Sequence, residues 1–443
     1  MMDKKPPLLR LFFPIFLELL FTMLTGVVDT LMLSSVGDHA VGAVGTANSY
    51  INVFLVMFTI ISSGMLAVMT QYIGADRPDV AGQTLRLGLL INLAVGLLVA
   101  ALLCLYAQPI LRAVGIAEDL EEPAKVYMQT VGLFSVCSAL IPIFSSYLRA
   151  FGHTASTLAA TVAANITNVI LNAFFLFVLD LGVWGIALAT GISRLLNLVW
   201  VWLDSRHRIK PAPVGRKLRN RELLGKILQV GLPGAMESSL YNLAVMLVIS
   251  FLNRMDSTGT QAIARAYTAQ ISNFSFCAGC ALSQANAIIA GWQIGAGELE
   301  DCDRSTRRNA SIGMLLGGVT AACFALFARP ILSIFTQDKH IINLVGTLLW
   351  VDVALEMGRA FNMVYGLALK SSGDATYPMI IAIVFMFLFA VGGTWFFGIQ
   401  LGWLAVGAYV GMALDECIRG VFMYLRWCRG IWKSKNLLSE SCE

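Results

Sequence analysis

Polar side chains lie within apolar runs of this sequence, where a membrane protein could use them to bind a small cation. Asp29 is in the first apolar run, Asn168 and Asn172 are in the fifth, and Thr190 is in the sixth. Asn168 and Asn172 are one helical turn apart, so they share a helix face. A carboxylate, two amides and a hydroxyl form a set of hard oxygen ligands that suits Na⁺ or a proton shared with water. The alternative is that the amides only hold neighbouring helices together.

Further acids lie in apolar runs of the second half. Glu237 follows Pro233 by four residues, and Asp352 and Glu356 are one helical turn apart. A carboxylate at the bilayer centre costs about 2.5–3.5 kcal/mol on insertion scales, so each acid needs a partner or a function. We expect these three acids to contribute to substrate binding or ion coupling. The alternative is an ion pair between Glu356 and Arg359, which would leave Asp352 unpaired near the surface.

Two prolines, Arg265 and a set of three charged residues complete the candidates. Pro14 and Pro233 fall inside predicted helices, where proline removes a backbone hydrogen bond and creates a kink that can act as a hinge. Arg265 has no partner at helical spacing, so we expect a carboxylate from another helix to pair with it. The close spacing of Asp415, Glu416 and Arg419 is interpreted as a structural ion pair.

The sequence offers little for metal or enzyme chemistry. Its four histidines are in predicted loops or at helix ends, and the CxxC motif Cys277–Cys280 lies in an apolar run without a second ligand pair. We interpret the two cysteines as small packing residues. No nucleophile–base constellation is apparent, so we expect no enzymatic activity and no cofactor.

The elements that must position these residues follow from composition. Of the 443 residues, 57% are hydrophobic and 13% are charged, about half the charged fraction of an ordinary soluble protein. A cytosolic enzyme, a secreted disulfide scaffold and a disordered chain are therefore excluded. We predict an all-α polytopic membrane protein, because apolar runs long enough to span a bilayer recur along the chain. The twelve runs are 8–32, 43–72, 86–107, 124–148, 157–179, 183–203, 227–252, 259–291, 309–328, 342–369, 377–397 and 404–425.

The basic residues predict the orientation of these runs. If the N-terminus is inside, most Lys and Arg outside the runs fall in inner segments, as the positive-inside rule expects. We predict a multi-pass protein of the cell (inner) membrane with both termini in the cytoplasm. The basic segment 206–226 is interpreted as an inner linker near the lipid bilayer, and no nucleic-acid partner is expected.

The two halves of the chain resemble each other. Pro14–Glu18 matches Pro233–Glu237 at an offset of 219, and Arg149–Gly152 matches Lys370–Gly373 at an offset of 221. Repeats of six helices share one topology, so we predict two pseudo-symmetric six-helix bundles around a central cleft, as in transporters. The predicted parts are an N-terminal bundle (1–203), a cytoplasmic basic linker (204–226), a C-terminal bundle (227–430) and a cytoplasmic tail (431–443).

The sequence resembles the multidrug and toxic compound extrusion (MATE) family over essentially its whole length. The resemblance is carried by Pro14 followed by Val28–Met32, by Leu148–Thr154, by Gly185–Thr190, by Gly231–Pro233 and by Lys370–Ala375. It implies a monomeric antiporter that exports an organic, often cationic, small molecule as Na⁺ or H⁺ enters.

The resemblance also implies roles for single residues. Asp29, Asn168 and Thr190 match residues that build the N-terminal cation site of related members, and Asn172 stands where some members carry Asp. Glu237 matches the acid that members using the C-terminal bundle have in their seventh helix, and either Asp352 or Glu356 supplies the acid of the tenth. The alternative cargo is a lipid-linked glycan or cell-wall precursor, moved by a flippase of the same superfamily.

Overall fold

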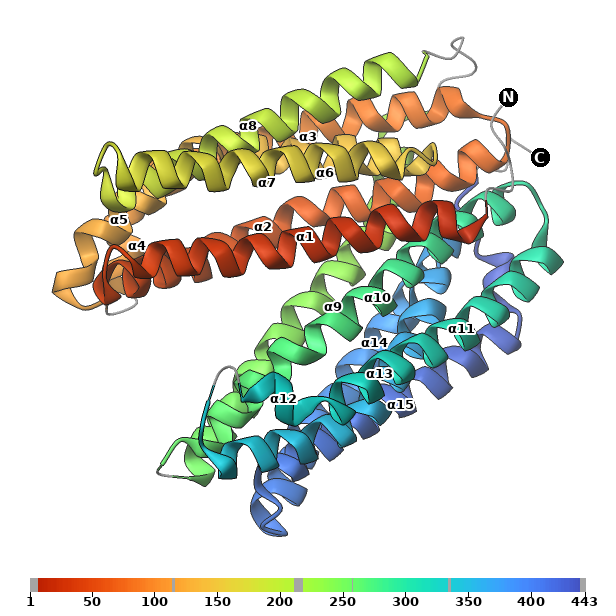
Figure 1. The fold of residues 1–443 in the computed structure, drawn as a ribbon. Coiled ribbons are helices and arrows are strands. Elements are labelled where there is room, and N and C mark those ends of the chain that lie inside the picture. The colour runs from red at the N-terminus through yellow and green to blue at the C-terminus, as the bar shows by residue number, and fades with distance from the viewer. Residues whose placement is uncertain (1–6, 114–115, 211–217, 257, 334–335, 439–443) are drawn as a thin grey trace. The chain divides into compact units, whose positions relative to one another are not determined.

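The chain forms a helical protein with two compact units, residues 1–231 (unit 1) and 232–443 (unit 2). The computed structural model describes residues 7–113, 116–210, 218–256, 258–333 and 336–438 (Figure 1). No strand occurs in these ranges. The predicted all-α class is confirmed.

Unit 1 contains eight complete helices and the start of a ninth. Their bounds are α1 (Leu8–Ser34), α2 (Asp38–Gly74), α3 (Pro78–Leu105), α4 (Ala107–Ala113), α5 (Glu118–Leu133), α6 (Ser135–Ala150), α7 (Thr154–Phe177), α8 (Gly182–Arg208) and α9 (Asn220–Met255). Helix α1 packs mainly on α7, and α7 packs on α8. These two contacts bring the first, fifth and sixth apolar runs together.

Unit 2 repeats this order with local differences. It contains the rest of α9 and the helices α10 (Thr260–Gly295), α11 (Leu299–Leu326), α12 (Ala328–Leu332), α13 (Lys339–Ser372), α14 (Thr376–Phe385) and α15 (Leu404–Cys428), with a short 3₁₀ turn η3 (Ile431–Ser434). Helix α14 continues into two π-helical stretches, η1 (Met386–Val391) and η2 (Thr394–Gln400). Helix α13 packs against α10, α11 and α15 and forms the centre of the unit.

The lengths and compositions of the helices fit a bilayer. Within the described ranges, ten helices are long and apolar enough to cross a membrane, and the pair α5–α6, bent by 47°, qualifies as an eleventh span. Helix α15 has 25 residues and also carries Asp415, Glu416 and Arg419, so its charge rather than its length sets it apart. With α15 counted, the spans agree with the twelve predicted runs.

The internal repeat is visible in small elements as well as long ones. The short helices α4 and α12 each follow the third long helix of their half, and they begin 221 residues apart, at Ala107 and Ala328. The fourth span differs between halves, because unit 1 breaks it at Phe134 whereas α13 runs unbroken. The single run predicted over 124–148 therefore consists of parts of two helices, α5 and α6, with a bend between them.

The ends of the predicted linker and the predicted tail are structured. Helix α8 continues to Arg208 and α9 begins at Asn220, while residues 211–217 of the predicted linker lie outside the described residues. After α15, the Trp432 side chain is fully buried and its ring stacks on Trp427 with centroids 4.1 Å apart. The first residues of the predicted tail therefore pack onto unit 2.

Candidate functional site

A polar cluster in unit 1 joins three of the predicted cation-site residues. The Asn172 Nδ2 atom donates to Asp29 Oδ1 at 2.9 Å and to Asn168 Oδ1 at 3.1 Å. Asn168 Nδ2 in turn donates to the Ser193 hydroxyl at 3.4 Å. Helix α1 supplies the carboxylate, α7 supplies both amides from one face, and α8 supplies the hydroxyl. We call Asp29, Asn168, Asn172 and Ser193 the N-terminal cluster.

The N-terminal cluster contains an oxygen that could accept a cation or a protonated group. Asn172 is completely buried, and its Oδ1 atom has no hydrogen-bond partner among the described residues. A buried polar atom without a partner costs about 1–3 kcal/mol, so such an atom beside a carboxylate suits a ligand that supplies positive charge. The oxygen chemistry of the cluster thus fits Na⁺, a proton or a protonated water.

Thr190 lies beside this cluster and contacts it through the backbone. Its hydroxyl donates to the Ile186 carbonyl at 2.9 Å, and its own carbonyl accepts from the Ser193 hydroxyl at 2.9 Å. Ser193, which the sequence analysis did not single out, therefore connects Thr190 to Asn168. Ser193 could have been predicted from the sequence, because it follows Thr190 by three residues and so lies on the same helix face.

Two further residues of unit 1 extend this polar region. The Tyr127 hydroxyl donates to Asn48 Oδ1 at 3.2 Å, is within hydrogen-bonding reach of Thr190, and lies near both Asp29 and Arg194. Arg194 donates to the Ser138 hydroxyl at 3.0 Å and forms no ion pair with any described residue. The guanidinium group of Arg194 on α8 thus places a positive charge near Tyr127 and Ser138.

A larger charged cluster in unit 2 joins α13 to α15. Arg359 pairs with Glu356 at 2.5 Å and with Glu416 at 3.4 Å. Arg419 pairs with both Asp415 and Glu416 at 2.8 Å. The ion pair between Glu356 and Arg359 that the sequence allowed is present, and the pairing expected within 415–419 is part of a network across two helices.

Asp352 is buried, in contrast to the surface position considered for it. Its exposed fraction is 2%, and its Oδ2 atom accepts a hydrogen bond from the Ser272 hydroxyl at 2.5 Å. Asp352, Glu356, Asp415 and Glu416 supply four carboxylates, whereas Arg359 and Arg419 supply two guanidinium groups. Because buried charges require compensation, this cluster can take up protons or a cation.

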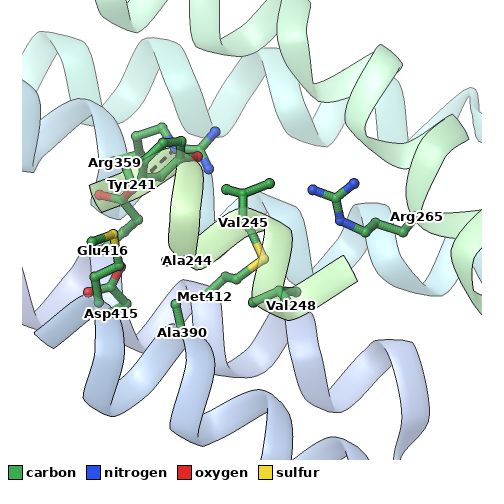
Figure 2. A pocket seen from close by; sticks show the side chains of 11 residues that line it. Tyr241, Ala244, Val245, Val248, Arg265, Arg359, Ala390, Met412, Asp415 and Glu416 are labelled. Atoms are coloured by element: carbon green, nitrogen blue, oxygen red, sulfur yellow. Dashed lines mark hydrogen bonds and ion pairs between the residues drawn. The ribbon is translucent and has the colours of Figure 1, made fainter. Parts of the chain in front are cut away.

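A small cavity of about 20 Å³, room for about one water molecule, lies beside this charged cluster (Figure 2). Its polar lining consists of Tyr241, Arg265, Arg359, Asp415 and Glu416. Figure 2 shows Arg265 on the opposite side of the apolar lining from the acids. Among the described residues no carboxylate forms an ion pair with Arg265, so the partner expected from another helix is not found.

Apolar side chains make up the rest of this cavity. They are Ala244, Val245, Val248, Met386, Ala390 and Met412. Methionine side chains adapt to ligands of different shapes, so the two of them give the cavity a compliant wall. Tyr241 was missed by sequence reasoning, although it lies one helical turn after Glu237, on the same face of α9.

Glu237 is held by an ion pair rather than being free to bind a ligand. Its carboxylate lies 2.8 Å from the Lys370 amine, and Glu18 in unit 1 lies 2.9 Å from the Arg149 guanidinium. The two pairs occupy corresponding places in the repeat. We call them the twin ion pairs. Glu237 is not among the residues that line the cavity.

The two prolines lie four residues before these glutamates. Pro14 is inside α1 and Pro233 is inside α9, so both helices lack a backbone donor there. Near the second proline, a Cβ atom on Gly231 would lie 1.9 Å from the Ile60 carbonyl oxygen, so glycine permits the close packing of α9 on α2. A close backbone contact thus lies two residues before Pro233, where α9 can bend.

Metal-binding clusters of the usual protein type are not found here. Within the described ranges, no group of three or more His, Cys, Asp or Glu side chains is arranged to hold a metal ion. The eight described cysteines form no disulfides with one another.

Comparison with known proteins gives matches over both halves. The MatE family model matches residues 14–174 and again 233–396. The chain is 32% identical to the uncharacterized transporter YisQ of Bacillus subtilis, with 98% of this chain and 96% of YisQ aligned. It is 25% identical to the probable multidrug resistance protein NorM of Thermotoga maritima, with 98% and 94% aligned.

A solved structure has the same fold. The crystal structure of a MATE protein in the bent conformation superposes with a TM-score of 0.89 at 18% sequence identity, covering 98% of this chain and 96% of the other. The two matches to one family model also correspond to the two halves of the internal repeat.

Proposed function

Because the chain belongs to the MATE family of multidrug efflux transporters, we propose that it is an antiporter that exchanges Na⁺ or H⁺ for an organic, cationic small molecule. The exported molecules are drugs or toxic metabolites. The protein works as a monomer in the cell (inner) membrane, with both termini in the cytoplasm. It needs no cofactor and carries out no chemical conversion of its cargo.

The N-terminal cluster is the observation that carries this proposal. Asp29 is its one carboxylate, and the unpartnered Asn172 Oδ1 atom lies in the same cluster. Binding of Na⁺ or a proton there cancels the charge of Asp29 and changes its hydrogen bond to α7. The contact between α1 and α7 therefore depends on whether the site is loaded.

Coupling requires that the cation and the cargo favour different conformations. A ligand shifts a conformational equilibrium only by its difference in affinity between the states. We assign the hinges to Pro14 and Pro233, which allow α1 and α9 to bend when the cation binds. The mechanism is alternating access, in which the cation-loaded state has the lower affinity for cargo.

In unit 2, the cavity and the acids around it contribute to cargo binding or coupling. Asp415 and Glu416 line the cavity and attract a cationic group. The cavity has room for only about one water molecule in this structure, so it must open before its apolar and methionine side chains contact the body of an organic molecule. Asp352 and Glu356 act from the buried side of the charged cluster, and Glu237 acts through its ion pair with Lys370.

Efflux of a fluorescent cationic dye from proteoliposomes tests the proposal. A Na⁺ gradient and a pH gradient are imposed in separate experiments, on the unmodified chain and on the Asp29→Asn variant. We expect one of the two gradients to drive dye transport, and the variant to lose that gradient dependence because it cannot change charge.

The matched control is Asp180→Asn. Asp180 is exposed in the turn between α7 and α8, at a positive φ of 51° that asparagine tolerates. This variant should transport dye like the unmodified chain. Full gradient-driven efflux by Asp29→Asn would contradict the role of Asp29. Absence of dye transport under either gradient, together with altered lipid-linked precursors in cells, would favour the flippase.

A further inference from the structure

A lateral groove in unit 1 lies outside the polar clusters described above. It has a volume of about 380 Å³ and is formed by α3, α6 and α8. All of its lining residues are apolar: Leu89, Leu90, Leu93, Leu140, Phe144, Leu198, Val199 and Trp202. Leu90 remains 67% exposed, and no other part of unit 1 covers it. The groove therefore suits an apolar chain supplied by the surroundings.

Two arginines stand at one end of this groove. Arg86 precedes Leu89 and Leu90 by three and four residues on α3, so it continues the same helix face. Arg206 follows Trp202 by four residues on α8, and its guanidinium lies 4.8 Å from the centre of the Trp202 ring. Both arginines are exposed, and neither forms an ion pair with any described residue.

The two arginines belong to the same end of unit 1. Arg86 lies in the third turn of α3 and Arg206 in the last turn of α8. Near the start of α3, Gln83 donates to the Leu218 carbonyl at 2.6 Å, which links that start to the chain segment following α8. Tryptophan beside arginine is typical of the boundary between hydrocarbon and headgroups.

We propose that the groove binds one anionic phospholipid, with an acyl chain against its leucines and the phosphate between Arg86 and Arg206. The lining has no polar group to bind the head of a ligand, and neither arginine has an acidic partner among the described residues, so one molecule with an apolar chain and an anionic head satisfies both. Arginine is well suited to phosphate because its planar guanidinium offers two parallel donors.

Fluorescence quenching locates such a lipid. The purified full chain in detergent is titrated with phosphatidylglycerol that carries bromine on its acyl chains, and in parallel with brominated phosphatidylcholine. Bromine quenches nearby tryptophan, and the difference between the unmodified chain and Trp202→Phe isolates the signal of the groove. We expect that signal to saturate at lower concentration for phosphatidylglycerol.

Arginine variants test the preference for an anionic headgroup. Arg86→Gln with Arg206→Gln should reduce the preference for phosphatidylglycerol over phosphatidylcholine, by about fivefold for each arginine. The charge-preserving variant with Lys at both positions should keep most of it. The control with Gln at Arg254 and Arg329, two exposed arginines of unit 2, should behave like the unmodified chain.

Several results would overturn the proposal. Equal quenching by both lipids would show that the groove holds acyl chains without reading the headgroup. If the variant with Gln at Arg86 and Arg206 kept the preference for phosphatidylglycerol, these two arginines would not be the phosphate ligands. No Trp202-dependent quenching by either lipid would mean that the groove is filled otherwise, for example by a second copy of the chain.

Discussion

The Asp29 carboxylate is positioned by residues that are far from it in the sequence. Its hydrogen bond to Asn172 joins positions 143 residues apart. Spacing alone indicated that Asn168 and Asn172 share a helix face, and the structure brings that face to Asp29. Spacing could not indicate that the Thr190 hydroxyl turns back to its own helix, because a threonine hydroxyl commonly bonds to the carbonyl one turn earlier.

A single substitution tests the charge of the N-terminal cluster. Asn172→Asp would place a second carboxylate beside Asp29. Because two adjacent carboxylates bind a cation or share a proton more tightly than one, we expect half-maximal coupling at a cation concentration at least tenfold lower. The measurement is initial dye efflux in proteoliposomes as a function of Na⁺ concentration or pH.

The matched control is Asn343→Asp, the same substitution at an exposed position near the start of α13 in unit 2. It should leave the cation dependence where it is in the unmodified chain. Identical cation dependence in Asn172→Asp and the unmodified protein would show that Asn172 does not contact the coupling ion.

At the scale of elements, the helices were more predictable than their ends and bends. Each long helix follows from an apolar run, because a bilayer-spanning segment must satisfy its backbone internally. The bend between α5 and α6 was not predictable from hydropathy, since both helices are apolar enough to form one run. The burial of Trp432 was also missed, because a basic segment after the last span resembles a solvated tail.

The twin ion pairs connect elements in a way that the repeat helped to anticipate. Sequence matching aligned Glu18 with Glu237 and Arg149 with Lys370, but it could not show that each glutamate pairs with the aligned base. In unit 1 the pair joins α1 to α6, and in unit 2 it joins α9 to α13. Each pair holds the proline-containing helix of its unit against that unit's fourth span.

Charge exchange tests whether these pairs act as fasteners. Glu18→Gln should lower the free energy of unfolding by about 1–3 kcal/mol, because it removes the ion pair to the half-buried Arg149. The reversed pair, Glu18→Arg with Arg149→Glu, should recover part of this loss. Thermal unfolding in detergent and a double-mutant cycle give the coupling free energy.

The same comparison in unit 2 separates two roles for Glu237. If Glu237 acts through its ion pair, Glu237→Gln and Lys370→Gln should change the ion dependence of dye efflux alike. A change in Glu237→Gln alone would show that the carboxylate binds cation or cargo directly. If the losses of stability from the two single substitutions simply added, in the cycle of Glu18 with Arg149 and in that of Glu237 with Lys370, the ion pairs would not stabilise the helix contacts.

For the whole molecule, composition predicted the class and the internal repeat predicted the number of units. Low charge content excluded a soluble fold, and matches at offsets near 220 residues indicated two units of like topology. The charged cluster of unit 2 was less predictable. Their spacing on one helix lets Asp415, Glu416 and Arg419 pair with one another. Nothing in the sequence therefore indicated that Arg359 on α13 also pairs with Glu416.

The two charged regions of the molecule differ in composition, and we expect them to have different functions. The N-terminal cluster has one carboxylate with oxygen ligands nearby, whereas the unit 2 cluster has more acids than bases beside a cavity. We expect the first to sense the coupling ion and the second to contact cargo. This division requires that the two ligands influence each other through the conformation of the transporter, and such influence is reciprocal.

Countertransport measures that reciprocity most directly. Proteoliposomes are loaded with the cationic dye at equal internal and external pH and Na⁺, and the efflux of dye is followed together with the movement of protons or of radioactive Na⁺. We predict that dye leaving down its own gradient drives uptake of one of these cations, although no gradient of that cation is present at the start. Asp29→Asn should abolish this uptake. Dye efflux without any accompanying cation uptake would contradict cation-coupled exchange.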